Sequence, residues 1–165
     1  MTPYKIRKAA ETDIPEIVRV TNTAYEVEHF CIEGDRTNHS DVQARMKSGL
    51  FLVAEGAEEP KQIWGTVYIT SSNDRGYMGT LSVDPNRQGS GIAKALIAAT
   101  EEQCRRDGSK FLDITVLDLR TDLFPFYARL GFSPNAMEPF LRPAKIIRPV
   151  RLIRMTKPLY QTHEL

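Results

Sequence analysis

The sequence predicts one α/β (α+β) domain built around a mixed β-sheet. Short apolar and β-branched runs alternate with stretches of helical periodicity, in the order β-α-α-β-β-β-α-β-α-β. The chain has 165 residues, enough for one hydrophobic core but little for two. Hydrophobic residues make up 41% and charged residues 26% of the chain, a globular balance. No linker or internal repeat interrupts the sequence, so we expect residues 1–165 to form a single domain.

The chain opens with a predicted strand over residues 4–8, followed by a first helix. Asp13 is the expected N-cap of that helix, and Glu16, three residues later, completes a capping-box pattern. The apolar stripe of this helix is formed by Ile14, Ile17, Val18, Thr21 and Ala24.

A loop and a second, shorter helix are expected next. Residues 29–39 show no periodicity and predict the loop. Ser40 with Gln43 repeats the capping pattern, and Gly49 is placed to end the helix.

The middle of the chain predicts three antiparallel strands that form a meander. Each run is short, rich in aromatic or β-branched residues and bounded by polar turns. The runs cover residues 50–54, 63–69 and 77–83.

The remaining chain predicts two helices and two strands. Gly89 precedes a strongly periodic helix that Gly108 closes, and Gly131 follows a shorter one. The tail is rich in proline, so its strand is expected at a sheet edge. In order, these elements are a helix over 92–106, a strand over 111–116, a helix over 123–130 and the edge strand over 150–155.

The glycine-containing loop before the long helix is the first chemical signal. Gly89 and Gly91 allow the backbone to turn sharply and to approach a ligand. The first amides of the following helix have no partner within it and favour an anion such as a pyrophosphate. A tight turn with no ligand explains the same glycines equally well. The loop matches neither the Walker A pattern nor Gly-x-Gly-x-x-Gly, which disfavours nucleotide-binding folds.

Two motifs in sequence order make the signal specific. Gln88-x-x-Gly91-x-Ala93 resembles motif A of the GNAT superfamily of N-acetyltransferases, Gln/Arg-x-x-Gly-x-Gly/Ala. Phe126-Tyr127, followed by Gly131-Phe132, is similar to that family's Phe-Tyr-x-x-x-Gly-Phe motif. A helix and a strand separate the two motifs, as in the family, and the resemblance covers about residues 4–157.

The resemblance implies a mostly antiparallel sheet of six to seven strands with about four helices, in which strands four and five splay apart. It also implies acetyl-coenzyme A as co-substrate. The main chain of Leu81, Ser82 and Val83 would hold the pantetheine arm and the thioester. The pyrophosphate would lie on the amides of Gln88, Gly89, Ser90, Gly91, Ile92 and Ala93.

The chemistry implied by the resemblance is direct attack of an amine on the thioester, without an acyl-enzyme. Tyr127 matches the family's general acid and is also expected to contact the cofactor; a packed core tyrosine is the alternative. An amide near Leu81 or Val83 would polarise the carbonyl oxygen. Tyr77 stands where some members carry a catalytic glutamate, which leaves Glu33, Asp35 or a base acting through water.

Three residues depart from the family pattern or carry other chemistry. Many members have asparagine where this chain has Arg120, which leaves a cofactor contact open; a surface pair with Asp118 is the expectation. Cys104 is expected in the core. Cys31 lies in the first loop. No base is evident near it in the sequence, so its thiol is not expected to act as a nucleophile.

Composition and charge limit the class of protein and its partners. A net charge of +1 gives no bulk attraction to nucleic acid or to an anionic membrane. No apolar run approaches the roughly 20 residues of a membrane span, and the N-terminal residues lack the apolar core of a secretory signal. Two cysteines are too few for a thiolate metal site, and no metal is expected. We therefore expect a cytoplasmic protein, monomeric or homodimeric.

The sequence does not identify the amine acceptor. A small-molecule or peptide amine is expected, and by resemblance residues 26–40 and 133–149 would surround it. The rival hypothesis is a non-catalytic acyl-coenzyme A sensor on the same fold. Acyl donors longer than acetyl are a third possibility, decided by the depth of the cleft.

Overall fold

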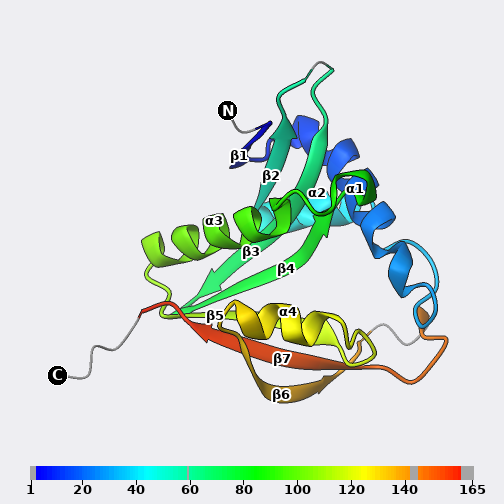
Figure 1. Ribbon diagram of the computed structural model, residues 1–165, viewed down its shortest axis with the longest axis vertical. Helices are drawn as coiled ribbons and strands as arrows, with labels where there is room; N and C mark the ends of the chain where they lie inside the picture. The colour runs from blue at the N-terminus through cyan, green and yellow to red at the C-terminus, as the bar shows by residue number, and fades with distance from the viewer. Residues whose placement is uncertain (1–2, 59, 142–144, 161–165) are drawn as a thin grey trace.

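The computed structural model describes residues 3–58, 60–141 and 145–160. These residues form a seven-stranded sheet in the order β1-β2-β3-β4-β5-β7-β6 (Figure 1). The strands are β1 (Tyr4–Lys8), β2 (Leu50–Gly56), β3 (Ile63–Ser72), β4 (Arg75–Val83), β5 (Phe111–Leu117), β6 (Ser133–Pro139) and β7 (Arg151–Pro158). The helices are α1 (Ile14–Ala24), α2 (His39–Ser48), α3 (Ile92–Arg106) and α4 (Leu123–Arg129), with short 3₁₀ turns η1 (Glu11–Asp13), η2 (Tyr25–Glu28) and η3 (Pro85–Arg87). The predicted fold class is confirmed.

Helices cover both faces of the sheet (Figure 1). Successive residues of a strand point to opposite faces, and β2 follows this rule. Phe51 and Val53 pack in the cluster that contains α1 and α2, whereas Leu52 and Ala54 pack in the cluster that contains α3 and α4. The sheet is therefore the central layer between two hydrophobic cores. No helix among the described residues is long and apolar enough to cross a membrane.

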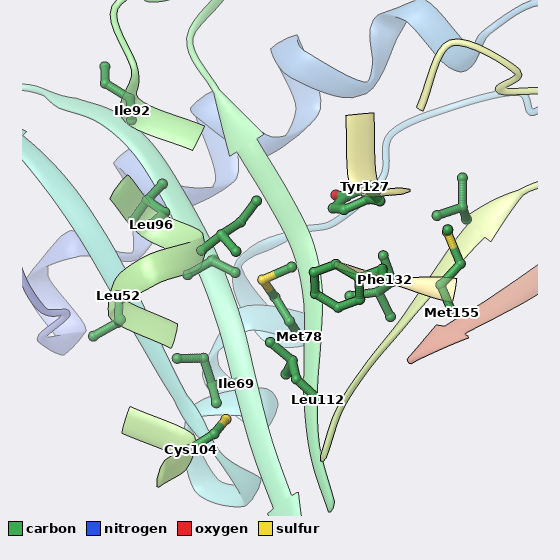
Figure 2. Close-up of a cluster of buried hydrophobic side chains, with 14 of the residues drawn as sticks. Leu52, Ile69, Met78, Ile92, Leu96, Cys104, Leu112, Tyr127, Phe132 and Met155 are labelled. Carbon is green, nitrogen blue, oxygen red and sulfur yellow. The ribbon is translucent and has the colours of Figure 1, made fainter. Parts of the chain in front are cut away.

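The larger core fixes α3 and α4 against the same sheet face (Figure 2). Leu96 of α3 and Leu112 of β5 are fully buried, and Phe132, just after α4, is 2% exposed. Burying one such side chain contributes roughly 1.5–3 kcal/mol. Gly65 of β3 allows α3 to approach, because a Cβ there would lie 2.7 Å from Cγ2 of Ile92.

The sheet opens between β4 and β5. These strands are parallel and pair only at Arg75–Phe111, Gly76–Leu112 and Tyr77–Asp113. Beyond those pairs β4 continues to Val83 and β5 to Leu117 with no further register partners between them. The expected splaying of strands four and five is thus present.

A β-bulge lies in β4 along the opened stretch. Thr66 pairs with Ser82 and Tyr68 with Gly79, so two residues of β4 face one of β3. Thr80 has a φ of 46°, a left-handed conformation that is uncommon for a β-branched residue. Strain of this kind tends to accumulate at functional sites.

The predicted helix caps are confirmed only in part. Asp13 is the N-cap residue of α1, as expected, but its side chain makes no capping hydrogen bond, because the carboxylate accepts from the Ala10 amide at 2.7 Å and binds Arg7 at 2.8 Å. Glu16 binds Arg19 instead of closing a capping box. The cap of α2 is Asn38, whose Oδ1 accepts from the Asp41 amide at 2.9 Å, two residues before the predicted Ser40.

The C-terminal strands also differ from the prediction. The strand expected at 150–155 is β7, and it lies inside the sheet between β5 and β6. The edge is β6, over residues expected to form part of a loop. Pro134 and Pro139 belong to β6, which is consistent with the confinement of proline to sheet edges.

Candidate active site

A cavity of about 870 Å³ lies at the opening between β4 and β5. Its wall combines the end of α1 with η2, the far end of β4, the start of α3, and the segment from Leu119 to Tyr127. Eight of the sequence-predicted site residues line it: Leu81, Val83, Gln88, Gly89, Gly91, Ile92, Ala93 and Tyr127. Ser82 and Ser90 lie in the same segments but not on the lining.

The start of α3 presents free backbone amides to the cavity. Gly89 and Gly91 both have a φ of +82°, and an added Cβ would find no atom within 4 Å at either position. Gly91 is the N-cap of α3, and its carbonyl accepts the first helical hydrogen bond, from Ala95, at 3.0 Å. The amides before Ala95 therefore have no partner inside the helix and can bind an anion.

Two basic side chains flank these amides. Lys94 lines the cavity one turn into α3, and Arg87 lines it from η3. The guanidinium of Arg87 lies 3.9 Å from the centroid of the Trp64 ring, a cation–π contact that fixes its position. This side of the cavity is electropositive and suits phosphate groups.

The β4 edge that faces the opening carries unpaired backbone. After Tyr77, β4 has no register partner on β5, and Thr80 and Leu81 have none on β3. Leu81 and Val83 line the cavity, whereas the Ser82 hydroxyl turns back to donate to the Thr80 carbonyl at 2.8 Å. An extended ligand with amide groups can pair with such an edge as an added strand does.

Tyr127 projects from α4 into this space and is only 8% exposed. Its ring packs edge-on against Phe126, with ring centroids 5.1 Å apart. It packs edge-on against Phe132 as well, with ring centroids 5.6 Å apart (Figure 2). Burial desolvates the phenol and raises the pKa of Tyr127 above its ordinary value of 10.0. The hydroxyl is therefore protonated at neutral pH, the state that a proton donor needs.

Two further tyrosines, Tyr25 and Tyr77, lie near Tyr127. Tyr25 lines the cavity from η2, and burial raises the pKa of Tyr25 to about 12. Tyr77 reaches across the opening, where its hydroxyl lies 3.1 Å from Oγ1 of Thr115 on β5. Tyr25 belongs to neither sequence motif, and nothing in its sequence context distinguishes it from a surface residue.

Arg120 does not pair with Asp118 as the sequence suggested. Its Nη1 donates to Glu28 at 2.8 Å, and its Nε donates to Asp122 at 3.1 Å. The Asp118 carboxylate instead accepts from the Arg151 amide at 3.0 Å. The Arg120–Glu28 pair joins η2 to the segment before α4, two segments that are 92 residues apart in sequence.

The two loop carboxylates proposed as bases lie outside this cavity. Glu33 and Asp35 are exposed, and Asp35 lines a second, much smaller cavity on the far side of Tyr25. The buried carboxylate of the same region is Glu28, and its burial raises the pKa of Glu28 above its ordinary value. Sequence gives little warning of Glu28, because a glutamate between two short turns is usually solvated.

Both cysteines are buried. Cys104 packs in the α3 core, as expected. Cys31 is fully buried, its thiol donates to the Glu28 carbonyl at 3.4 Å, and burial raises its pKa. A buried thiol with a raised pKa is a poor nucleophile. Among the described residues, no group of three or more His, Cys, Asp or Glu side chains is arranged to bind a metal.

Comparison with protein families gives one match. The family model described as "Acetyltransferase (GNAT) family" matches residues 14–132, which span the chain from the start of α1 to the end of the second motif. A comparison with curated proteins finds no match.

Solved structures share the fold at low sequence identity. The ribosomal-protein-S18-alanine N-acetyltransferase of Escherichia coli is 15% identical with a TM-score of 0.74, covering 98% of this chain and 97% of its own. Ard1 of Thermoplasma volcanium is 16% identical with a TM-score of 0.76, covering 96% and 99%. YncA of Salmonella typhimurium, solved with its cofactor acetyl-CoA, is 21% identical with a TM-score of 0.73, covering 99% and 97%. At these identities the likeness concerns the fold.

Proposed function

This chain belongs to the acetyltransferase (GNAT) family, and from that premise we propose that it transfers the acetyl group of acetyl-coenzyme A directly to a primary amine. Membership makes it an acyltransferase. The observation that carries the finer proposal is the position of Tyr127, a buried phenol that lines the same cavity as the free amides of α3.

The cavity fits acetyl-coenzyme A in both shape and charge. The amides from Gln88 to Ala93, with Arg87 and Lys94 beside them, would hold the pyrophosphate. The unpaired β4 edge from Leu81 to Val83 would hydrogen-bond the pantetheine amides. The open space over Gly89 and Gly91 leaves room for phosphate oxygens close to the backbone. When bound, the co-substrate supplies an acetyl group activated as a thioester.

The protein groups around the reacting end have complementary roles. The backbone at the Thr80 bulge directs the Leu81 amide away from β3 pairing, and we assign it to the thioester carbonyl oxygen. Tyr127 would donate its proton to the departing thiolate. Because Glu33 and Asp35 do not line the cavity, we propose that water in the cavity carries the proton of the amine to bulk solvent.

The test is acetyl-coenzyme A turnover with a panel of amines, followed as release of free coenzyme A, for the wild-type protein and for Tyr127→Phe. Loss of a general acid should lower kcat by about a hundredfold or more. The KM for acetyl-coenzyme A should change little, because phenylalanine keeps the ring packing. Tyr160→Phe is the matched control, since Tyr160 is 53% exposed and does not line the cavity.

Two outcomes would contradict the proposal. Equal kcat for Tyr127→Phe and Tyr160→Phe would remove Tyr127 from the chemistry. Tight acetyl-coenzyme A binding with no turnover above buffer on any amine would favour the non-catalytic sensor.

A further inference from the structure

One wall of the cavity exposes apolar side chains to solvent. Val27, Phe30 and Leu119 are 58%, 44% and 38% exposed, and all three line the cavity. They are three of the seven large hydrophobic side chains exposed in the described part of the chain: Val27, Phe30, Leu119, Met137, Leu141, Ile147 and Tyr160. Single exposed apolar residues are ordinary, but their gathering on a cavity wall marks a surface that binds an apolar group. We call Val27, Phe30 and Leu119 the apolar wall.

A buried ion pair joins the two segments that carry the apolar wall. Val27 and Phe30 flank Glu28, and Leu119 precedes Arg120. The 2.8 Å ion pair between Glu28 and Arg120 therefore fixes the two parts of the wall side by side. The side chains of this pair are only 8% and 16% exposed, so the bridge is shielded from salt and water.

The charges beside the apolar wall do not favour an anion. The guanidinium of Arg120 already binds two carboxylates, those of Glu28 and Asp122. Arg36 lies over the Tyr25 ring and lines the smaller cavity rather than this one. Asp122 lines the large cavity and is exposed, but both of its carboxylate oxygens accept from Arg120 at 3.1 Å, so this pair presents no free charge of either sign to a ligand.

The cavity is thus divided. Its cations and free amides lie at the start of α3, where Arg87 and Lys94 suit phosphates. Its apolar wall lies across the opening, on η2, the residues just after η2 and the segment before α4. An acceptor that enters from the apolar wall meets hydrophobic surface and the paired charges of Arg120 and Asp122, in the cavity that Tyr25 and Tyr127 also line.

We propose that the acceptor is a primary amine with an aromatic or branched aliphatic body and no carboxylate. The inference rests on the proposed acetyl transfer and specifies its acceptor. The apolar body would cover Val27, Phe30 and Leu119 while the amine faces the reacting end. A carboxylate next to the amine would lose its hydration with no free cation offered by Arg120, which disfavours amino acids as acceptors.

The test compares three amines that differ by one feature each. 2-Phenylethylamine has the aromatic body, phenylalanine adds a carboxylate to it, and ethanolamine lacks the body. We expect kcat/KM for 2-phenylethylamine to exceed that of each of the others by about tenfold or more. Phe30→Ala should lower kcat/KM for 2-phenylethylamine by about tenfold through KM, and should lower kcat/KM for ethanolamine by a much smaller factor. Met137→Ala is the control, since Met137 is 59% exposed and lies off the cavity.

Binding separates this inference from the proposed function. Calorimetric titration of 2-phenylethylamine into protein saturated with coenzyme A measures the affinity of the apolar wall for the amine in the absence of acetyl transfer. Binding that Phe30→Ala abolishes, in a protein that turns over no amine, would support the wall and overturn the transferase. Equal binding or turnover by wild type and Phe30→Ala would overturn the wall, as would preference for phenylalanine or ethanolamine. A dimer that Phe30→Ala dissociates would show that a second copy covers the wall, and would also overturn the inference.

Discussion

Arg120 shows how a single departure from a motif changes its neighbours. The guanidinium lies between a buried carboxylate, Glu28, and an exposed one, Asp122. Burial raises the pKa of Glu28, whereas the nearby cations Arg36 and Arg120 act in the opposite direction. Breaking the pair with the exposed Asp122 should cost little stability. Breaking the pair with the buried Glu28 should cost much more, because it leaves an unpaired buried charge.

Replacing Arg120 by methionine should therefore destabilise the protein by about 2–4 kcal/mol at pH 7. Without its partner, the Glu28 carboxyl keeps a folded-state pKa even further above the ordinary 4.5. A raised folded-state pKa gives stability that is present below the unfolded-state value and lost as the pH rises through the folded-state value. The penalty of Arg120→Met should consequently shrink between pH 7 and about pH 4.5, as measured by urea unfolding at each pH.

The control for that measurement is Glu28→Gln, which keeps the shape of the side chain and removes its charge. Combined with Arg120→Met, it should recover part of the lost stability and flatten the pH dependence. A penalty for Arg120→Met that is the same at both pH values would show that packing, not the Glu28 charge, is responsible.

Sequence reasoning at the level of single residues succeeded where a motif fixes the position and failed where burial decides the role. Tyr127 was placed by its motif, and the structure sets it on the cavity wall. Glu28 and Tyr25 carry no local pattern, because their burial depends on α4 and β5, which lie about 90 residues further along the chain. Arg120 was assigned the wrong partner, since a near neighbour in sequence, Asp118, was preferred to a distant one.

Helix α3 is the element on which the cofactor half of the site depends. Its bounds, Ile92–Arg106, are those that the sequence predicts. Its apolar stripe is strong, and glycines with positive φ lie at both ends, Gly91 before it and Gly108 after it. Neither glycine has an atom within 4 Å of where a Cβ would lie, so the two positions are a matched pair for substitution.

Gly91→Ala and Gly108→Ala should each destabilise the protein by about 1 kcal/mol, because alanine is strained in the left-handed region. Their effects on coenzyme A should differ. Gly91 lines the cavity and Gly108 does not, so only a methyl at residue 91 would keep phosphate oxygens from the amides. It should weaken coenzyme A binding by about tenfold, or ~1.4 kcal/mol. Thermal unfolding and calorimetric titration together check both expectations.

The difference in coenzyme A affinity between the two variants decides whether the start of α3 binds the cofactor. Equal coenzyme A affinity for Gly91→Ala and Gly108→Ala would mean that the start of α3 is only a tight turn. That was the alternative which the glycine loop, considered without the second motif, left open.

The N-terminal helices show why element boundaries were less predictable. The pattern Asp13-x-x-Glu16 satisfies a local rule, yet Arg7 on β1 binds Asp13 and Arg19 binds Glu16. These ion pairs depend on which strand lies beside the helix, and a local motif contains no such information. The N-cap of α2 is Asn38, two residues before the predicted Ser40, a difference within the usual uncertainty of a helix start.

The arrangement of the whole sheet could be predicted only in part. The meander β2–β3–β4 follows from its turns, and the splaying followed from the family resemblance. The insertion of β7 between β5 and β6 did not, because residues 133–149 were expected, by resemblance, to form an acceptor loop rather than to include a strand. A sheet edge tolerates the prolines at residues 134 and 139, and only the completed sheet shows which strand is the edge.

At the scale of the whole molecule, the three register pairs between β4 and β5 join two parts of the sheet, β1–β4 and β5–β7 (Figure 1). The joint is reinforced by Arg75, which donates twice to Asp113, both at 2.7 Å, while the Thr156 hydroxyl donates to the same carboxylate at 2.6 Å. Asp113 is 6% exposed, so it depends on these partners. The width of the opening beyond the joint depends on how firmly the joint holds.

Arg75→Met should loosen this joint more than the rest of the fold. We expect a loss of about 1–3 kcal/mol and faster amide hydrogen exchange at Gly76, Tyr77 and Leu112, because the Asp113 carboxylate loses its cation. Arg154→Met is the comparison, since Arg154 pairs with the more exposed Glu138 between β7 and β6 and its charge interaction with Asp113 is weaker than that of Arg75. It should cost less than about 1 kcal/mol. Exchange that rises equally in β1–β3 would show a general loss of stability, and the opening would then have no separate hinge at its base.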